Sequence, residues 1–155
     1  MANGKTLIAY ETKHGATEGA AKIIAQTLRE SGFEVELVDL KKQEQPDLAD
    51  YQNVVVGAGV RGGRVYGTAL KFLKNDLTGK KVAFYTSSSW GGTPGSYQSA
   101  LKWFVQKTIE KYPNVDFVYS EAFGGKIKYF KKTMLDSTDA SKVNAWAKIL
   151  AEKLQ

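Results

Sequence analysis

The strongest constraint on the fold is an alternation of short apolar runs with amphipathic runs along the chain. A run such as Val54–Val56 fits a buried strand, whereas Ala20, Ile24 and Leu28 recur at helical spacing. This alternation predicts βαβ units built around a parallel sheet. We expect strands at Lys5–Tyr10, Glu34–Asp39, Asn53–Ala58, Lys81–Thr86 and Val115–Ala122, and helices at Thr17–Ser31, Thr68–Asn75, Ser96–Tyr112 and Asp139–Leu154.

Five strands joined by helical crossovers leave few topologies, because such crossovers are right-handed and consecutive elements stay adjacent. We predict a three-layer α/β fold with a five-stranded parallel sheet in the order 2-1-3-4-5. The segment Lys41–Tyr51 is expected to be a linker with at most one helical turn, since Pro46 interrupts it. With 155 residues, the chain is expected to form one domain over 1–155. The order 2-1-3-4-5 places a ligand crevice at the carboxyl ends of strands one and three.

Composition limits the chemistry available to the chain. It has no cysteine and one histidine, so disulfides, thiolate catalysis, iron–sulfur ligation and multi-histidine metal sites are excluded. Redox chemistry would therefore require an organic cofactor. The net charge of +6 favours anionic partners. We find no leader pattern in the first residues and no long apolar run, and we expect a cytoplasmic protein.

The loop after the first predicted strand has the features of an anion site. It leads into a helix, whose N-terminal N–H groups and positive dipole end attract anions, and a glycine there allows close approach. The alternative is an ordinary capped turn with the histidine facing solvent. The candidate phosphate-binding residues are Thr12, Lys13, His14, Gly15, Ala16 and Thr17.

The loop after the third predicted strand is rich in glycine. Residues 57–62 match G-x-G-x-x-G, but a dinucleotide fingerprint should follow the first strand, so we discount that match. We interpret the loop as a wall lying against a flat ligand, the alternative being an ordinary glycine-rich turn. The candidate ligand-binding residues are Gly59, Val60, Arg61, Gly62, Gly63 and Tyr66.

The loop after the fourth predicted strand combines small hydroxyl residues, glycines and aromatics. Trp90 stands among polar residues, which suits a side chain that stacks on an aromatic ligand. The alternative is that this tryptophan folds back on the domain surface. The candidate residues are Ser87, Ser88, Ser89, Trp90, Gly91, Gly92 and Tyr97.

Together, these loops make the chain similar to the flavodoxin family over nearly its whole length. The string Thr12–Thr17 resembles the family's T-x-T-G-x-T phosphate loop, with His14 at a position where the family often has Thr or Tyr. The resemblance implies a non-covalent flavin mononucleotide (FMN), with its phosphate on that loop and the other two loops flanking its ring. Val55–Gly63 and Phe123–Tyr129 are similar to the menaquinone-dependent protoporphyrinogen oxidase branch, which carries a longer insertion after the position of Tyr129.

The most basic stretch, Lys126–Lys132, packs four lysines around two aromatics and could bind an acidic partner, porphyrin carboxylates or a membrane surface. The alternative is a solvated loop anchored by its aromatics. Nucleic acid is the least favoured partner, because no recognition motif is present. Three functions stay open: an electron carrier serving a redox partner protein or small-molecule acceptor, an FMN-dependent oxidoreductase acting on a quinone or protoporphyrinogen, and a flavin-free binding or regulatory module.

Overall fold

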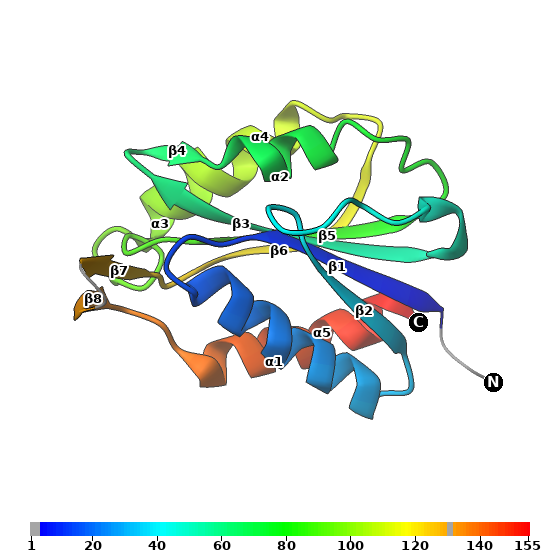
Figure 1. Cartoon of the computed structure of the whole chain (residues 1–155), viewed down its shortest axis with the longest axis horizontal. Coiled ribbons are helices and arrows are strands. Elements are labelled where there is room, and N and C mark those ends of the chain that lie inside the picture. The colour runs from blue at the N-terminus through cyan, green and yellow to red at the C-terminus, as the bar shows by residue number, and fades with distance from the viewer. Residues whose placement is uncertain (1–3, 130–131) are drawn as a thin grey trace.

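The protein has a central parallel sheet covered by helices on both faces (Figure 1). The structure, a computed structural model, describes residues 4–129 and 132–155, without the side chains of residues 127–135. The strand order is β2-β1-β3-β5-β6, and the short β4 pairs antiparallel with β3. The parallel strands therefore follow the predicted order 2-1-3-4-5. Their bounds are β1 (Lys5–Glu11), β2 (Glu34–Asp39), β3 (Asn53–Arg61), β4 (Arg64–Val65), β5 (Lys81–Ser87) and β6 (Asp116–Phe123).

Two apolar layers hold the helices on the sheet. On one face, α1 (Ala16–Glu30) and α5 (Ala140–Leu154) pack on alternate residues of the strands, with Ile24 and Leu150 fully buried. On the other face lie α2 (Gly67–Phe72) and a longer helical segment. Central strands covered on both faces must be apolar on both sides, which is why β3 is buried from Asn53 to Gly59.

The long helical segment differs from a regular α-helix. The predicted helix Ser96–Tyr112 is present, but its middle six residues form a π-helix. The three consecutive stretches are α3 (Tyr97–Ala100), η2 (Leu101–Gln106) and α4 (Lys107–Glu110). Single π-turns inside helices occur often at functional sites, and here the π-turn carries Phe104 toward the carboxyl ends of the strands.

Two hairpins were not predicted. Strand β3 continues to Arg61 and turns back into β4, and β6 is followed by β7 (Lys126–Tyr129) paired with β8 (Lys132–Asp136). The linker between β2 and β3 behaves as expected, with one 3-10 turn, η1 (Leu48–Asp50), capped by the Asp47 side chain. Among the described helices, none combines the length and the apolar character that crossing a bilayer requires.

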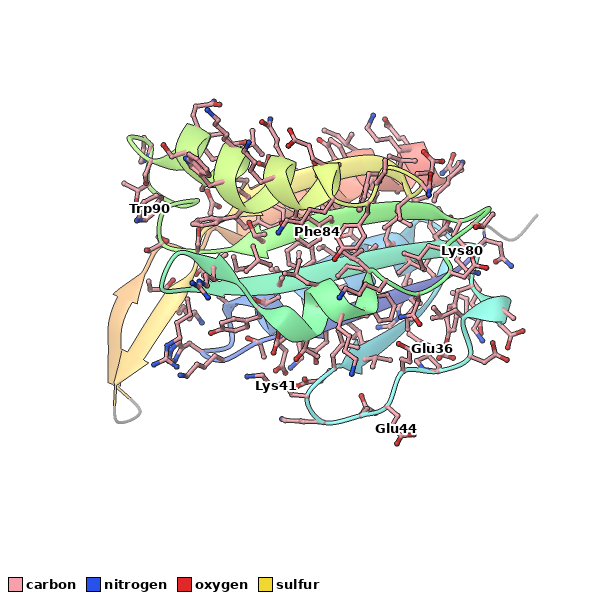
Figure 2. All side chains as sticks on the ribbon, turned by 90° about the horizontal axis from the view of Figure 1, so that it is seen from above. Glu36, Lys41, Glu44, Lys80, Phe84 and Trp90 are labelled. Carbon is pink, nitrogen blue, oxygen red and sulfur yellow. The ribbon has the colours of Figure 1, made fainter. Side chains whose placement is uncertain are left out.

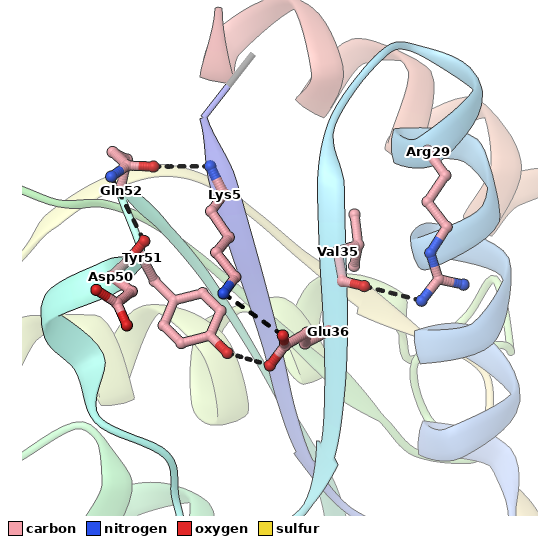
Figure 3. Close-up of polar contacts among 7 residues, drawn as sticks. All are labelled: Lys5, Arg29, Val35, Glu36, Asp50, Tyr51 and Gln52. Atoms are coloured by element: carbon pink, nitrogen blue, oxygen red, sulfur yellow. Dashed lines mark hydrogen bonds and ion pairs between the residues drawn. The ribbon is translucent and has the colours of Figure 1, made fainter. Parts of the chain in front are cut away.

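Polar contacts tie the three strands at the amino end of the sheet (Figure 3). The Lys5 N–H donates to Gln52 Oε1 at 2.7 Å, and Lys5 Nζ lies 3.5 Å from a Glu36 carboxylate oxygen. The Tyr51 hydroxyl donates to the other oxygen of Glu36. Burial, and then this hydrogen bond, raises the pKa of Tyr51 to about 12, while the bond lowers the pKa of Glu36. Since this network lies at the far end from the loops, it stabilises the scaffold without entering the site.

Candidate functional site

The loops at the carboxyl ends of the strands enclose a cavity of about 600 Å³. It draws residues from the β1–α1 loop, the β3–β4 hairpin, the β5–α3 loop, η2 and the start of β7. Figure 2 shows Trp90 at this end of the molecule. The cavity-lining residues are Thr12, Lys13, His14, Ala16, Thr17, Gly59, Val60, Arg61, Gly62, Gly63, Tyr66, Ser87, Ser88, Ser89, Trp90, Phe104, Gly125 and Lys126.

The N-terminus of α1 opens onto this cavity without a side-chain cap. Its N-cap, Gly15, has φ +93°, a left-handed conformation that suits glycine, and its N–H donates to Thr12 Oγ1 at 3.0 Å. The first helical bond is from the Gly19 N–H to the Gly15 carbonyl at 2.8 Å. The preceding N–H groups of the first turn are thus not used inside the helix and are available to an anion. The Thr12 hydroxyl accepts one bond and still has its own hydrogen to donate.

A buried tyrosine holds this helix start against the sheet. The Tyr85 hydroxyl donates to the Thr17 carbonyl at 2.8 Å, and complete burial raises the pKa of Tyr85 well above its ordinary value. To reach Thr17, the ring passes over Gly57, where an added Cβ would lie 2.3 Å from Tyr85 Cζ. The glycine at position 57 therefore makes room for the side chain that positions the first loop.

The second wall is the β3–β4 hairpin. Gly62 and Gly63 form its two-residue turn with φ +58° and +75°, the pair of positive values that a type I′ turn needs. The following Tyr66 N–H donates to the Gly59 carbonyl at 3.0 Å, and its ring lies so close to Gly59 that a Cβ there would be 2.9 Å away. Burial raises the pKa of Tyr66, Arg61 opposes that rise, and Glu11 adds to it.

The third wall, the end of β5 and the β5–α3 loop, has a hydroxyl without a hydrogen-bond partner among the described residues, and an exposed indole. Ser87 Oγ is buried and has no hydrogen-bond partner within the part of the chain that the structure describes. Trp90 is 51% exposed, and its ring centroid lies 5.9 Å from that of Phe104. A ligand with a polar edge and a flat apolar face would satisfy the hydroxyl and cover the indole.

All predicted site residues line the cavity except Gly15, Gly91, Gly92 and Tyr97. Gly91 and Gly92 pack instead against the main chain, where added Cβ atoms would lie 2.3 Å from the Phe123 carbonyl and 2.4 Å from that of Ser137. The roles of these residues toward a cofactor stay predictions.

Tyr97 faces the edge strand β6 rather than the cavity. Its hydroxyl donates to Glu121 Oε1 at 2.5 Å, and Lys142 Nζ lies 4.2 Å from its ring centroid. Burial, with this hydrogen bond, raises its pKa to about 12.

Sequence reasoning missed Phe104, which looked like an ordinary core position on a helical stripe. It also did not place Gly125 and Lys126 in the site, although two glycines after a strand were a signal. Lys126 begins the basic segment Lys126–Lys132; the other side chains of that segment, and residues 130–131 altogether, lie outside the described residues.

The charge of the cavity has one sign. Lys13, Arg61 and Lys126 line it, and no Asp or Glu does among the described residues. An uncapped helix N-terminus, three cations, a free hydroxyl and a flat aromatic side fit the parts of FMN: a dianionic phosphate, a polar chain and a flat ring with polar edges. The donor set thus matches the cofactor that the sequence resemblance implied.

Comparison with known proteins identifies the family of the chain. The profile of the flavodoxin domain family matches residues 7–153. Oxidised flavodoxin 2 from Bacillus cereus superposes with a TM-score of 0.70 at 23% identity, covering 97% of this chain and 99% of that one. Flavodoxin 1 from the same organism gives 0.67 at 21% identity, covering 98% and 100%.

A curated relative, protoporphyrinogen IX dehydrogenase [quinone] of Escherichia coli strain K12, is 32% identical over 74 residues. That match spans 48% of this chain and 41% of the relative, less than half of either protein. The family match, by contrast, runs over nearly the whole chain, and the two structural matches cover 97–98% of it. The chain therefore belongs to the flavodoxin domain family, whose members are FMN-binding redox proteins.

Proposed function

We propose that the chain holds one FMN in the cavity and works as an electron-transfer protein. The observation that carries this proposal is the uncapped N-terminus of α1, which opens into a cavity lined by cations and no carboxylate among the described residues. When bound, FMN supplies the redox chemistry, accepting and releasing electrons at its ring. The protein supplies binding, orientation and electrostatics, and no side chain is required as a catalyst.

Each wall has a separate role in this proposal. The first turn of α1 and the Thr12 hydroxyl donate hydrogen bonds to the phosphate, and Lys13 adds positive charge. The Ser87 hydroxyl bonds the polar part of the cofactor. Trp90 and Tyr66 contribute the flat surfaces on either side of the ring.

The first test is a titration of the purified apoprotein with FMN and, in parallel, with riboflavin, followed by visible absorption and flavin fluorescence. FMN should bind at least about tenfold more tightly than riboflavin, because charge-assisted hydrogen bonds to the phosphate contribute about 1.5–3 kcal/mol. Equal affinities would refute the phosphate site, and no binding of either compound would refute the cofactor assignment.

The aromatic wall has a matched control in the chain. Trp90 and Trp103 are both about half exposed, but only Trp90 lines the cavity. Trp90→Leu should weaken FMN binding by about 1–2 kcal/mol through lost stacking, whereas Trp103→Leu should leave the dissociation constant unchanged. Equal effects of the two substitutions would show that Trp90 does not contact the ring.

A second candidate is an FMN-dependent oxidoreductase acting on a quinone or protoporphyrinogen. The partial match to the E. coli dehydrogenase favours it, as do cavity cations beyond those that one phosphate requires. Steady turnover of menadione or protoporphyrinogen IX by the FMN-loaded protein would support this enzyme. Electron exchange with a redox partner protein, without turnover of either compound, would support the carrier.

A further inference from the structure

A buried carboxylate lies behind the cavity wall, outside the set of cavity-lining residues. Glu11, the last residue of β1, is 4% exposed. One oxygen, Oε2, lies 3.8 Å from Lys41 Nζ, and the other, Oε1, has no hydrogen-bond partner among the described residues. Burying a carboxylate costs free energy, which one ion pair with a half-exposed lysine offsets only in part. Packing alone therefore gives no reason for an acid at this position.

The opposing lysine is held by the turn that follows β2. The Leu40 N–H donates to the Tyr10 carbonyl at 2.8 Å, and the Lys41 N–H donates to Asp39 Oδ1 at 3.0 Å. In Figure 2, Lys41 lies against the body of the protein, whereas Glu44 on the same linker projects away from it. These bonds hold the main chain of Lys41 beside the end of β1, and its side chain, 46% exposed, reaches Glu11 from there.

Tyr66 separates this pair from the cavity. Lys41 Nζ lies 5.3 Å from the centroid of the Tyr66 ring, and Tyr66 itself lines the cavity. The ring cannot shift freely, because it packs on Gly59 and the main-chain N–H of Tyr66 donates to the Gly59 carbonyl. The two charges thus stand one side chain behind the site. Glu11 is buried, and a low local dielectric strengthens the effect of its charge, whereas solvent screens the half-exposed Lys41 more strongly.

We propose that Glu11 and Lys41 set the reduction potential of the flavin held in the cavity, with opposite signs. This inference rests on the proposed function, since it requires bound FMN. Reduction adds negative charge to the flavin, so a nearby carboxylate opposes reduction and a nearby ammonium favours it. The negative charge of Glu11 then opposes the effect of the cavity cations Lys13, Arg61 and Lys126 on the potential. Lys41 partly neutralises Glu11 and so determines how large that opposing effect is. Neither residue lines the cavity, so both would act on the flavin through the electric field of their charges.

The test is a set of FMN-loaded variants whose midpoint potentials are measured by equilibration with redox dyes. Glu11→Gln should make the potential less negative and Lys41→Met more negative, each by about tenfold in the reduced-to-oxidised ratio, or about 59 mV for a one-electron step. The double variant should return close to the wild-type value, and Lys41→Arg should keep it.

Matched controls come from the same linker. Lys42→Met removes a positive charge, as Lys41→Met does, and Glu44→Gln removes a negative charge, as Glu11→Gln does. Both residues are exposed, and both substitutions should leave the potential unchanged. A merely structural pair would weaken folding in both variants without moving the potential in opposite directions.

The outcomes distinguish a failure of this inference from a failure of the proposed function. Shifts of the same sign, or shifts no larger than those of the controls, would overturn this inference while leaving the FMN site in place. Failure of the wild-type protein to bind FMN would overturn the proposed function and this inference with it. Because Lys41 is half exposed, Lys41→Met and Lys41→Arg decide the question even if Glu11→Gln does not fold.

Discussion

At the scale of single residues, the site is positioned in part by residues that do not line the cavity. Tyr85 is completely buried, yet its hydroxyl bond to the Thr17 carbonyl positions the start of α1. Gly57 has no unusual backbone angle, and its importance lies in the space that it leaves for the Tyr85 ring. The requirement for glycine here is a packing requirement and not a conformational one.

Gly57→Ala should therefore destabilise the protein and weaken FMN binding together. The added methyl must displace Tyr85, and overpacking of this kind costs about 1–3 kcal/mol of unfolding free energy. Urea unfolding and FMN titration measure both effects. Gly19→Ala is the control, since its Cβ would meet nothing within 4 Å and a helical alanine should stabilise by about 0.5–1 kcal/mol. Unchanged stability of Gly57→Ala would contradict the packing argument.

The raised pKa of Tyr51 predicts a loss of stability at alkaline pH. The folded state holds this pKa at about 12, above the ordinary value of 10.0, so its contribution is complete below pH 10.0 and disappears as the pH rises toward about 12. Tyr51→Phe should lower the unfolding free energy by about 1 kcal/mol at neutral pH and remove that alkaline decline. Unfolding free energies measured across this pH range provide the check.

A second variant separates the causes of this pKa shift. Glu36→Gln removes the charge that accepts the Tyr51 hydrogen bond but leaves the burial of the ring. The pKa of Tyr51, followed by tyrosinate absorbance, should then fall only part of the way toward its ordinary value. A complete return would show that burial contributes nothing.

At the scale of elements, the cavity depends on how helices and strands end. The α1 N-terminus provides N–H donors because its N-cap is a left-handed glycine and no side chain covers the first turn. Strand β3 continues past its neighbours into a hairpin, so that a regular element rather than a loose loop forms the second wall. The π-turn η2 brings Phe104 beside Trp90.

The β3–β4 turn provides the prediction at this scale. Gly63→Val places a branched side chain at φ +75° and should cost about 1–2 kcal/mol, which the short hairpin cannot absorb. We expect a clear loss of FMN affinity with little change in global unfolding, because the hairpin extends beyond the strands that flank β3 in the sheet. Gly62→Asn, a residue tolerated in type I′ turns, should bind FMN normally. Equal affinities for both variants would exclude the hairpin from the binding site.

The sequence predicted the elements better than their ends. The periodicity of Ala20, Ile24 and Leu28 located α1, and the run Val54–Val56 located a central strand, because burial requires those patterns. The β3–β4 hairpin was missed since its glycines carry no hydrophobic periodicity. The π-turn was missed because an apolar stripe such as Leu101, Phe104 and Val105 fits a regular helix equally well.

Candidate site residues were predictable where a loop follows a strand, since the carboxyl ends of parallel strands meet at one edge. Contacts that depend on tertiary packing were not. Tyr97 and Phe104 lie in one helical segment, yet one faces Glu121 and the other the cavity. Likewise, the pairing of Glu11 with Lys41 joins segments 30 residues apart, and no local pattern announces it.

At the scale of the whole molecule, the charge distribution should influence the flavin. The chain carries +6, and cations gather at the cavity end of the sheet. A positive surround stabilises the negative charge that reduction adds, so we expect a less negative potential than that of an acidic flavodoxin titrated in parallel. Raising the salt concentration screens the exposed charges and should bring the two values closer. A very low potential that does not respond to salt would contradict this expectation.

The β7–β8 hairpin has a consequence for how such proteins diversify. Its two ends are joined where Ser137 N–H donates to the Gly125 carbonyl at 2.9 Å and the Gly125 N–H donates to Ser137 Oγ at 3.1 Å. Gly124 lies so close to Ser137 that a Cβ would be 1.8 Å from its carbonyl oxygen. A segment closed at its base costs a fold little to lengthen or replace. Evolution, or an engineer grafting a recognition module, can therefore replace the segment between Gly125 and Ser137 while the scaffold beneath it stays intact.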